Sequence, residues 1–163
     1  METVTFRFAG FLYHFGLAVW IGGSLALGGL AAPALFRELE RSRAGAIFGG
    51  ILRRFSRMRA AALLVAIAGG IWRTVAWESS VLDTPFSMFS AIVVARWLCL
   101  VVLAVALLYE IGVLEPAIGR RRQILENDQK PASGDAEFGT LHRRSELLMK
   151  GMVVVACLAL FFD

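Results

Sequence analysis

The sequence predicts an all-α integral membrane protein, built as a four-helix bundle of membrane spans in a single transmembrane domain over residues 1–163. Two observations carry this prediction. Hydrophobic residues make up 58% of the 163 residues, and the mean hydropathy is +0.67. A soluble domain of this size needs a more polar composition, because it has to cover its surface. The charged residues also gather between the apolar runs, as expected when the connections lie in water and the spans in lipid.

Each predicted span is close to the ~20 apolar residues that a bilayer requires. The spans cover residues of about 8–36, 58–77, 88–114 and 141–162. The last span reaches full length only if its helix begins near Leu141, which places His142 and Glu146 at its interfacial start. The two cysteines of the chain lie inside apolar runs, so they form no disulfide framework.

The connections between the spans differ in charge. The first contains an apolar stretch, 44–52, flanked by arginines, and is expected to form a short amphipathic interfacial helix between spans one and two. The second is a short acidic turn at 78–85, and the third is a flexible polar loop at 127–135 that follows three arginines. Because cytoplasmic connections hold the excess of Lys and Arg, the basic loops are expected in the cytoplasm. Both termini are then on the outer, or periplasmic, face of the cell (inner) membrane.

The formal net charge of +4 comes from the basic loops, and it indicates contact with anionic lipid headgroups in addition to the lipid bilayer. Nucleic acid is not an expected partner, since no basic stretch is interleaved with polar readout residues. Small residues on the first span predict close helix packing. Gly22, Ala26 and Gly29 form one ridge, and Gly16 and Gly23 form an adjacent stripe. Such a surface suits a homo-oligomer or a larger membrane complex.

Ionisable residues at membrane depth are costly, so they are candidates for function. At ~1.5 Å rise per residue, the outer half of the bundle is expected to hold His14, Arg73 and Arg96, with Cys99 and Cys157 near them. The alternatives are structural. His14 can be a hydrogen-bonded packing residue, Arg73 a snorkelling interfacial residue, and the cysteines small apolar packers.

A second polar network is expected in the inner half of the bundle, and its members are Glu110, His142, Glu146 and Lys150. Arg96, Leu103 and Glu110 are spaced by whole heptads, so this stripe is predicted to face the bundle interior. Glu110 is then expected to meet Lys150 or Arg143 across the bundle.

The two histidines of the chain are expected near opposite faces of the membrane. His142, at the start of its helix, is expected to pair with Glu146 one turn on. A haem held by both histidines does not fit this topology. A site at His14 therefore has one histidine, with a second ligand of another type or an open position.

Several motifs resemble those of an uncharacterised membrane family. They are His14-x5-Trp20-x-Gly22-Gly23, the Ala-Pro-Ala-Leu-Phe stretch at 32–36, the run from Arg96 to Pro116, and Leu141-His142-x-x-Ser145. These look like the four-helix proteins grouped as a domain of unknown function, whose eukaryotic members are small transmembrane proteins. More distantly, the first motif and the four-span layout are similar to the copper-resistance D proteins and to the HemJ-type protoporphyrinogen oxidase, a haem-containing four-helix enzyme. The latter resemblance implies that His14 is a haem-iron ligand.

Haem binding is the function that these features favour. An outer-half site of His14, Trp20, Arg73 and Arg96 is expected to bind haem b or another porphyrin, because an imidazole can ligate iron and two guanidiniums suit two propionates. If the protein is an enzyme, it is a membrane haem-dependent oxidoreductase. Catalysis is not the expectation, since the sequence has no nucleophile–base pair, phosphate loop or metal-ligand cluster with diagnostic spacing.

Two other functions stay open. In one, the protein handles copper or a small solute, and His14, Cys99 and Cys157 are the copper contacts. In the other, it is a non-catalytic accessory subunit of a membrane complex, and the small-residue ridge and the interfacial helix are its docking surfaces.

Overall fold

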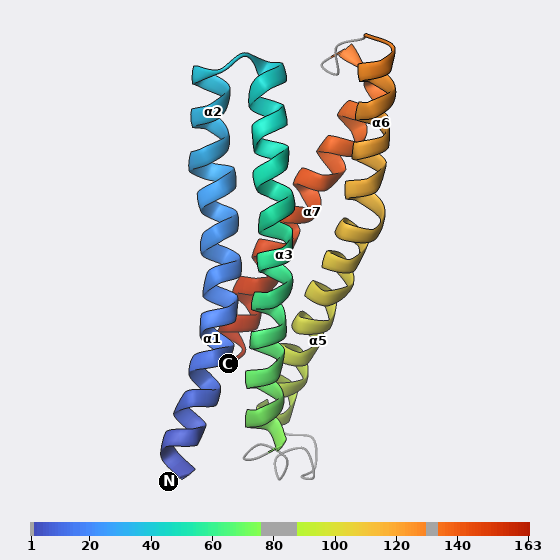
Figure 1. The fold of residues 1–163 in the computed structure, drawn as a ribbon. Helices are drawn as coiled ribbons and strands as arrows, with labels where there is room; N and C mark the ends of the chain where they lie inside the picture. The colour runs from blue at the N-terminus through green and yellow to red at the C-terminus, as the bar shows by residue number, and fades with distance from the viewer. Residues whose placement is uncertain (1, 76–87, 130–133) are drawn as a thin grey trace.

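The computed structural model describes residues 2–75, 88–129 and 134–163, and its helices form an elongated bundle (Figure 1). The helix α1 (Glu2–Leu25) continues through the π-helical η1 (Ala26–Ala31) into α2 (Ala32–Glu38), and α3 (Arg41–Arg73) returns beside it. The helix α5 (Met88–Tyr109) continues through the π-helical η3 (Glu110–Leu114) into α6 (Glu115–Asn127), and α7 (Ala136–Phe161) returns. The described residues contain no strand, so the predicted all-α fold is confirmed.

Three helical stretches of the described residues are long and apolar enough to cross a membrane, and they are Val4–Glu38, Arg43–Arg73 and Ala91–Asn127. Their length and composition define a membrane protein. The predicted fourth span, 141–162, lies on α7, which is not one of the three. The first half of α7 is charged, and Lys150 extends that charge to its middle. A count of four spans therefore stays a prediction.

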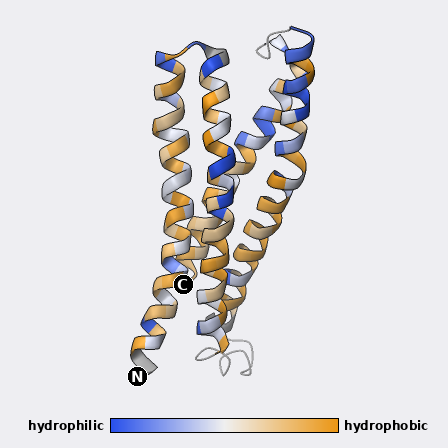
Figure 2. Ribbon diagram, viewed as in Figure 1, coloured by the Kyte–Doolittle hydropathy of each residue, from blue (hydrophilic) through white to orange (hydrophobic). Residues whose placement is uncertain are grey.

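The interfacial helix predicted at 44–52 is not a separate element, because these residues form the first turns of α3. The arginines between residues 53 and 59 lower the local hydropathy, but residues 51–59 contain no proline or glycine that would end a helix. Figure 2 shows these hydrophilic residues within an unbroken ribbon. The helix of the second predicted span thus begins well before residue 58. The acidic turn at 78–85 lies outside the described residues.

The π-helical segments η1 and η3 each end two residues before a proline. Pro33 follows η1 and Pro116 follows η3, each in the first turn of the next α-helix. A proline has no N–H to donate, and its ring crowds the carbonyl of the preceding turn. Widening that turn to the π form accommodates the ring, so the helix continues through the proline in both places.

The helices pack around a common core. The helix α1 contacts α3 and α7, and α5 contacts the same two helices. The predicted stripe of Arg96, Leu103 and Glu110 faces this interior, since each residue is at most 2% exposed, and the heptad argument is confirmed. The buried core residues are Tyr13, Leu17, Trp20, Leu63, Ala66, Leu100, Leu103, Leu107, Met152, Ala156 and Ala159.

Glycines let α1 and α3 approach each other closely. A Cβ atom added at Gly69 would lie 2.7 Å from the backbone nitrogen of Tyr13, and one added at Gly16 would lie 2.8 Å from that of Ala66. Both distances are too short for carbon against nitrogen. The backbones of the two helices therefore meet without intervening side chains, as expected for close packing in lipid.

Only one of the two small-residue surfaces of the first span packs against the described residues. A Cβ atom at Gly22 or Gly29 would meet nothing within 4 Å among the described residues, so this predicted ridge does not pack within the chain. The adjacent stripe does, because Gly16 meets α3 and Gly23 meets the ring of Phe55. The two faces lie about 100° apart on the helix, and the spacing of small residues does not say which of them meets the neighbouring helix.

Both basic connections lie at one end of the bundle. The end of α2 and the start of α3 lie at the same end as the end of α6 and the start of α7 (Figure 1), and hydrophilic residues gather there (Figure 2). This placement agrees with the predicted topology. The assignment of that end to the cytoplasm stays a prediction.

Asp135 caps α7 and gives this end of the bundle a pH dependence. Its Oδ1 accepts a hydrogen bond from the backbone N–H of Phe138 at 2.7 Å, and its carboxylate pairs with Arg121. The hydrogen bond from Arg121 is the main cause that lowers the pKa of Asp135 to about 2. Because the folded-state pKa lies below the ordinary 3.8, the contact stabilises the fold above that pH and is lost as the pH falls through about 2.

We expect the amide chemical shift of Phe138 to titrate with a midpoint of about 2. In the Arg121→Gln variant, the midpoint should move up toward the ordinary value for an aspartate, because the stabilising donor is gone. A midpoint near 3.8 in the unmodified protein would show that the Arg121 contact is not formed in solution.

Candidate functional site

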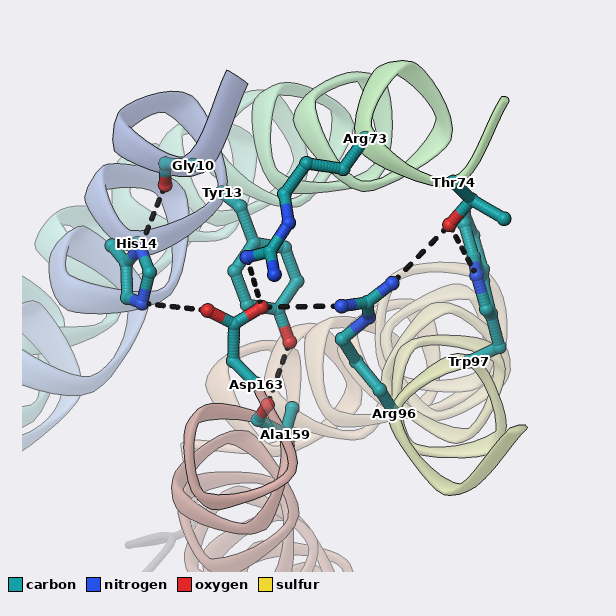
Figure 3. A network of polar contacts seen from close by, with 9 residues as sticks. All are labelled: Gly10, Tyr13, His14, Arg73, Thr74, Arg96, Trp97, Ala159 and Asp163. Atoms are coloured by element: carbon teal, nitrogen blue, oxygen red, sulfur yellow. Dashed lines mark hydrogen bonds and ion pairs between the residues drawn. The ribbon is translucent and has the colours of Figure 1, made fainter. Parts of the chain in front are cut away.

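The residues predicted for the outer half meet at the carboxylate of Asp163, which follows α7 (Figure 3). Its Oδ1 accepts hydrogen bonds from Nη1 of Arg73 at 2.6 Å and from Nη1 of Arg96 at 3.2 Å. Its Oδ2 lies 3.0 Å from Nε2 of His14. One carboxylate thus joins side chains from α1, α3 and α5. We call His14, Arg73, Arg96 and Asp163 the Asp163 cluster.

Both ring nitrogens of His14 face oxygen atoms. Nδ1 lies 2.7 Å from the backbone oxygen of Gly10, and a carbonyl oxygen only accepts hydrogen bonds, so Nδ1 carries a proton. Nε2 faces the carboxylate of Asp163, and a hydrogen bond there needs a proton on one of these two groups. The side chain of His14 is 52% exposed, so its ring can be approached from outside the bundle.

Contacts from α1 and the end of α3 hold Arg96 in place. Its Nη2 donates to Oγ1 of Thr74 at 3.2 Å, and its guanidinium carbon lies 5.7 Å from the ring centre of Tyr13. Tyr13 is itself fixed, because its hydroxyl donates to the backbone oxygen of Ala159 at 2.7 Å. Nε1 of Trp97 also donates to Thr74, at 3.2 Å. These groups replace the water that the buried guanidinium of Arg96 would otherwise need.

Asp163 is the member of the cluster that the sequence prediction lacks. The structure brings His14, Arg73 and Arg96 together, as their depths predict, but it does so through this carboxylate. A signal for it exists in the sequence. Two arginines at one depth require an anion, and Asp163 directly follows the apolar run that ends at that depth.

A second charged group lies deeper in the bundle, between α3 and η3. Nη2 of Arg59 donates to Oε1 of Glu110 at 2.8 Å, and the two side chains are 0% and 1% exposed. The same Nη2 donates to Oγ of Ser56 at 3.3 Å, and the Ser56 hydroxyl donates to Oε1 of Glu115. We call Ser56, Arg59, Glu110 and Glu115 the Arg59 centre.

Aromatic rings cover the guanidinium of Arg59. Its central carbon lies 5.5 Å from the ring centre of Trp20 and 5.3 Å from that of Phe55, and such contacts stabilise a cation where water is excluded. Nε and Nη1 of Arg59, Oε2 of Glu110 and Nε1 of Trp20 are buried and find no hydrogen-bond partner among the described residues. Buried polar atoms are usually paired, so this centre can accept further hydrogen-bonding groups.

The structure does not bring Trp20 to the Asp163 cluster with His14. Trp20 follows His14 by six residues, which is ~9 Å along a helix. Its ring is fully buried and lies against Arg59. The shared motif places both residues on α1, but the rotation of the helix directs them to different groups.

The predicted inner network divides into separate pairs. Glu110 does not meet Lys150 or Arg143, because Arg59 holds it. Lys150 pairs with Glu146 at 2.6 Å on the exposed surface of α7. The ring of His142 stacks on that of Phe138, with 6.4 Å between the ring centres, and Glu146 accepts its hydrogen bond from Lys150.

Arg59 is missed because it ends a run of arginines that is typical of an interfacial connection. The helical spacing contains the missing signal. Phe55, Arg59, Ala62 and Ala66 recur at intervals of three and four residues, and all are buried. This is the pattern of a core-facing stripe, so its one charged member is expected inside the bundle.

The remaining candidates do not form a metal site of the usual kind. Cys99 is partly buried and Cys157 is exposed. Among the residues that the structure describes, no group of three or more His, Cys, Asp and Glu side chains is placed to hold a metal ion. His142 also lies far from His14, because it stands some six helical turns before Asp163, or roughly 30 Å.

Apolar helices of membrane-spanning length, with charged groups buried between them, define an integral membrane protein of the helical class. The chain belongs to the family described as Domain of unknown function (DUF4149), whose model matches residues 15–124. No curated protein and no solved structure matches the chain significantly. The family agrees with the predicted resemblance to an uncharacterised group, whereas the likeness to copper-resistance D proteins and to the HemJ-type oxidase stays a prediction.

Proposed function

We propose that this membrane protein binds an anionic tetrapyrrole, haem b or a related porphyrin, at the Asp163 cluster. The orientation of the His14 ring carries the proposal. The Gly10 carbonyl accepts a hydrogen bond from Nδ1 at 2.7 Å, so Nε2 is the nitrogen that would bind a metal once the Asp163 carboxylate, 3.0 Å away, is displaced. Histidines that ligate metals usually donate their other N–H in this way, because the contact sets the tautomer and the ring orientation.

The surrounding residues fit such a ligand. Arg73 and Arg96 already bind a carboxylate, and guanidiniums suit the propionates of a porphyrin for the same reason. Phe11 and Phe15 flank His14 in the sequence and are more than half exposed, so they offer apolar surface for the ring system. His14 would hold the iron and the arginines the propionates. When bound, haem supplies one-electron chemistry, and the chain supplies ligation, orientation and charge.

One observation favours the accessory role instead. Asp163 links side chains of three other helices by itself. The cluster can therefore stabilise the packing of α7 against the other three helices without any ligand. Copper handling through His14, Cys99 and Cys157 has no comparable geometry in its favour. If the basic end faces the cytoplasm, the cluster meets its ligand from the outer side of the membrane.

The absorption spectrum of the protein, purified in mild detergent after expression with added haem, separates the two roles. We expect a Soret band that is lost or shifted in His14→Ala and kept in His142→Ala. His142 is the matched control, because it lies near the start of α7, whereas the Asp163 cluster lies at the end of that helix. The Arg73→Gln and Arg96→Gln variants are expected to weaken haem binding about tenfold, because each removes a charged hydrogen bond to a propionate.

An absent Soret band contradicts haem binding, and a band that is identical in the wild type and in His14→Ala contradicts ligation of the iron by His14. In the first case the accessory role predicts co-purification with a larger membrane complex from native membranes. A solitary, stable oligomer would contradict that role as well.

A further inference from the structure

We propose that His14, Arg73 and Arg96 form a receptor for a ligand carboxylate, and that the side chain of Asp163 occupies this receptor until a ligand displaces it. The inference rests on the proposed function for the location of the ligand. The new element is regulation: the carboxylate of Asp163 competes with the carboxylate of the ligand for the same three side chains.

The geometry of the cluster is that of a carboxylate receptor. Donors from three helices converge on the two oxygens of one side chain, at 2.6 and 3.2 Å for the arginines and 3.0 Å for the histidine. Guanidinium groups are the side chains best suited to carboxylates. The Arg96 guanidinium is also held in position within the receptor, because it donates to Thr74 and lies over the ring of Tyr13.

Asp163 can leave this receptor without unfolding a helix. It lies beyond the end of α7 at Phe161, and rotation about its own side-chain bonds moves the carboxylate while the backbone stays in place. The backbone N–H of Phe162 still donates to Leu158 at 3.0 Å and closes the helix. The exposed edge of His14 gives an incoming group access to Nε2, one of the three donors.

The surroundings indicate the class of ligand. The exposed side chains next to the receptor include Phe11, one turn before His14, and Phe161, two residues before Asp163, which are 58% and 80% exposed. A ligand that binds here therefore combines a carboxylate with an apolar body. Haem is one member of this class, and a fatty acid is another.

Competition by Asp163 lowers the apparent affinity by the fraction of time that the receptor is vacated. If Asp163 occupies it for about nine-tenths of the time, the apparent Kd rises about tenfold. The Asp163→Asn variant removes the competing charge, so it should bind an apolar carboxylate about tenfold more tightly than the wild type.

The test uses dodecanoate as the probe and dodecanamide as the matched uncharged control, with histidine labelled in the detergent-solubilised protein. The chain has two histidines, so His142 serves as an internal reference. We expect dodecanoate to shift the ring signals of His14 and not those of His142. The apparent Kd from this titration should be about tenfold lower in Asp163→Asn than in the wild type. Dodecanamide should shift the signals of neither histidine. Equal affinity in both proteins, or an equal response to the amide, overturns the exchange.

A second measurement covers the case in which Asp163→Asn folds poorly. With aspartate carboxyls labelled in the wild type, displacement predicts that the Asp163 signal moves as dodecanoate binds, and an unmoved signal overturns the inference. Haem binding is measured independently of this exchange, by the Soret band. A protein without that band that still exchanges Asp163 for dodecanoate disproves the haem proposal and keeps the receptor.

Discussion

The Glu110→Ala variant is expected to lose about 3–5 kcal/mol of stability, because removing one partner of a buried ion pair leaves the other charge uncompensated. Arg59 is 0% exposed, so water cannot take the place of the lost carboxylate without entering the core. Unfolding by SDS in mixed micelles, followed by circular dichroism, measures the loss. The matched control is Glu146→Ala, which breaks an exposed pair of similar length on α7 and should cost little.

A double variant separates the charge from the packing. Arg59→Met combined with Glu110→Leu removes both charges and keeps apolar volume in the core, so it should recover most of the stability that Glu110→Ala loses. If Glu110→Ala were no more damaging than Glu146→Ala, Arg59 would have another anion or water as its partner. The buried pair at the Arg59 centre would then not be the contact that the structure describes.

The Gly16→Val variant is expected to cost about 2–3 kcal/mol, because overfilling a tightly packed contact displaces the backbone. A Cβ atom at this position would meet the backbone oxygen of Ala62 and lie 2.8 Å from the backbone nitrogen of Ala66. Neither atom can turn away as a side chain would, so α1 and α3 have to separate. Stability in mixed micelles gives the size of the effect.

Gly22→Val is the matched control on the same helix. A Cβ atom at Gly22 meets nothing within 4 Å among the described residues, so this variant should stay within about 0.5 kcal/mol of the wild type. A loss at Gly22 as large as that at Gly16 would mean that the small-residue ridge packs against a second protein. It would then support the predicted homo-oligomer or complex.

Much of the candidate site follows from depth along the chain. Each residue advances a helix by ~1.5 Å, so the sequence places His14, Arg73 and Arg96 at one level and His142 far from them. Heptad spacing also directs Arg96 and Glu110 inward, and both are buried. These predictions depend on a single helix at a time, which is why they succeed.

The pairings fail where two helices are involved. The sequence predicts Lys150 or Arg143 as the partner of Glu110, but Arg59 is the residue in contact. Depth does not specify the rotation of a helix about its axis, and the π-helical turn at η3 changes that rotation beside Glu110. The arginines at 53–59 mislead the prediction for the same reason. Hydropathy shows that this segment is charged, but it does not show which of the arginines faces the core.

By itself, the sequence determined that this protein is made of apolar helices of membrane-spanning length, with its charges at defined depths, because hydropathy and helical rise are properties of each segment alone. Only the tertiary structure decided which charges meet. Asp163 gathers His14 and two arginines, and Arg59 takes Glu110, because the close contact of α1 and α3 and the rotation of η3 arise from packing between segments that are distant in the chain.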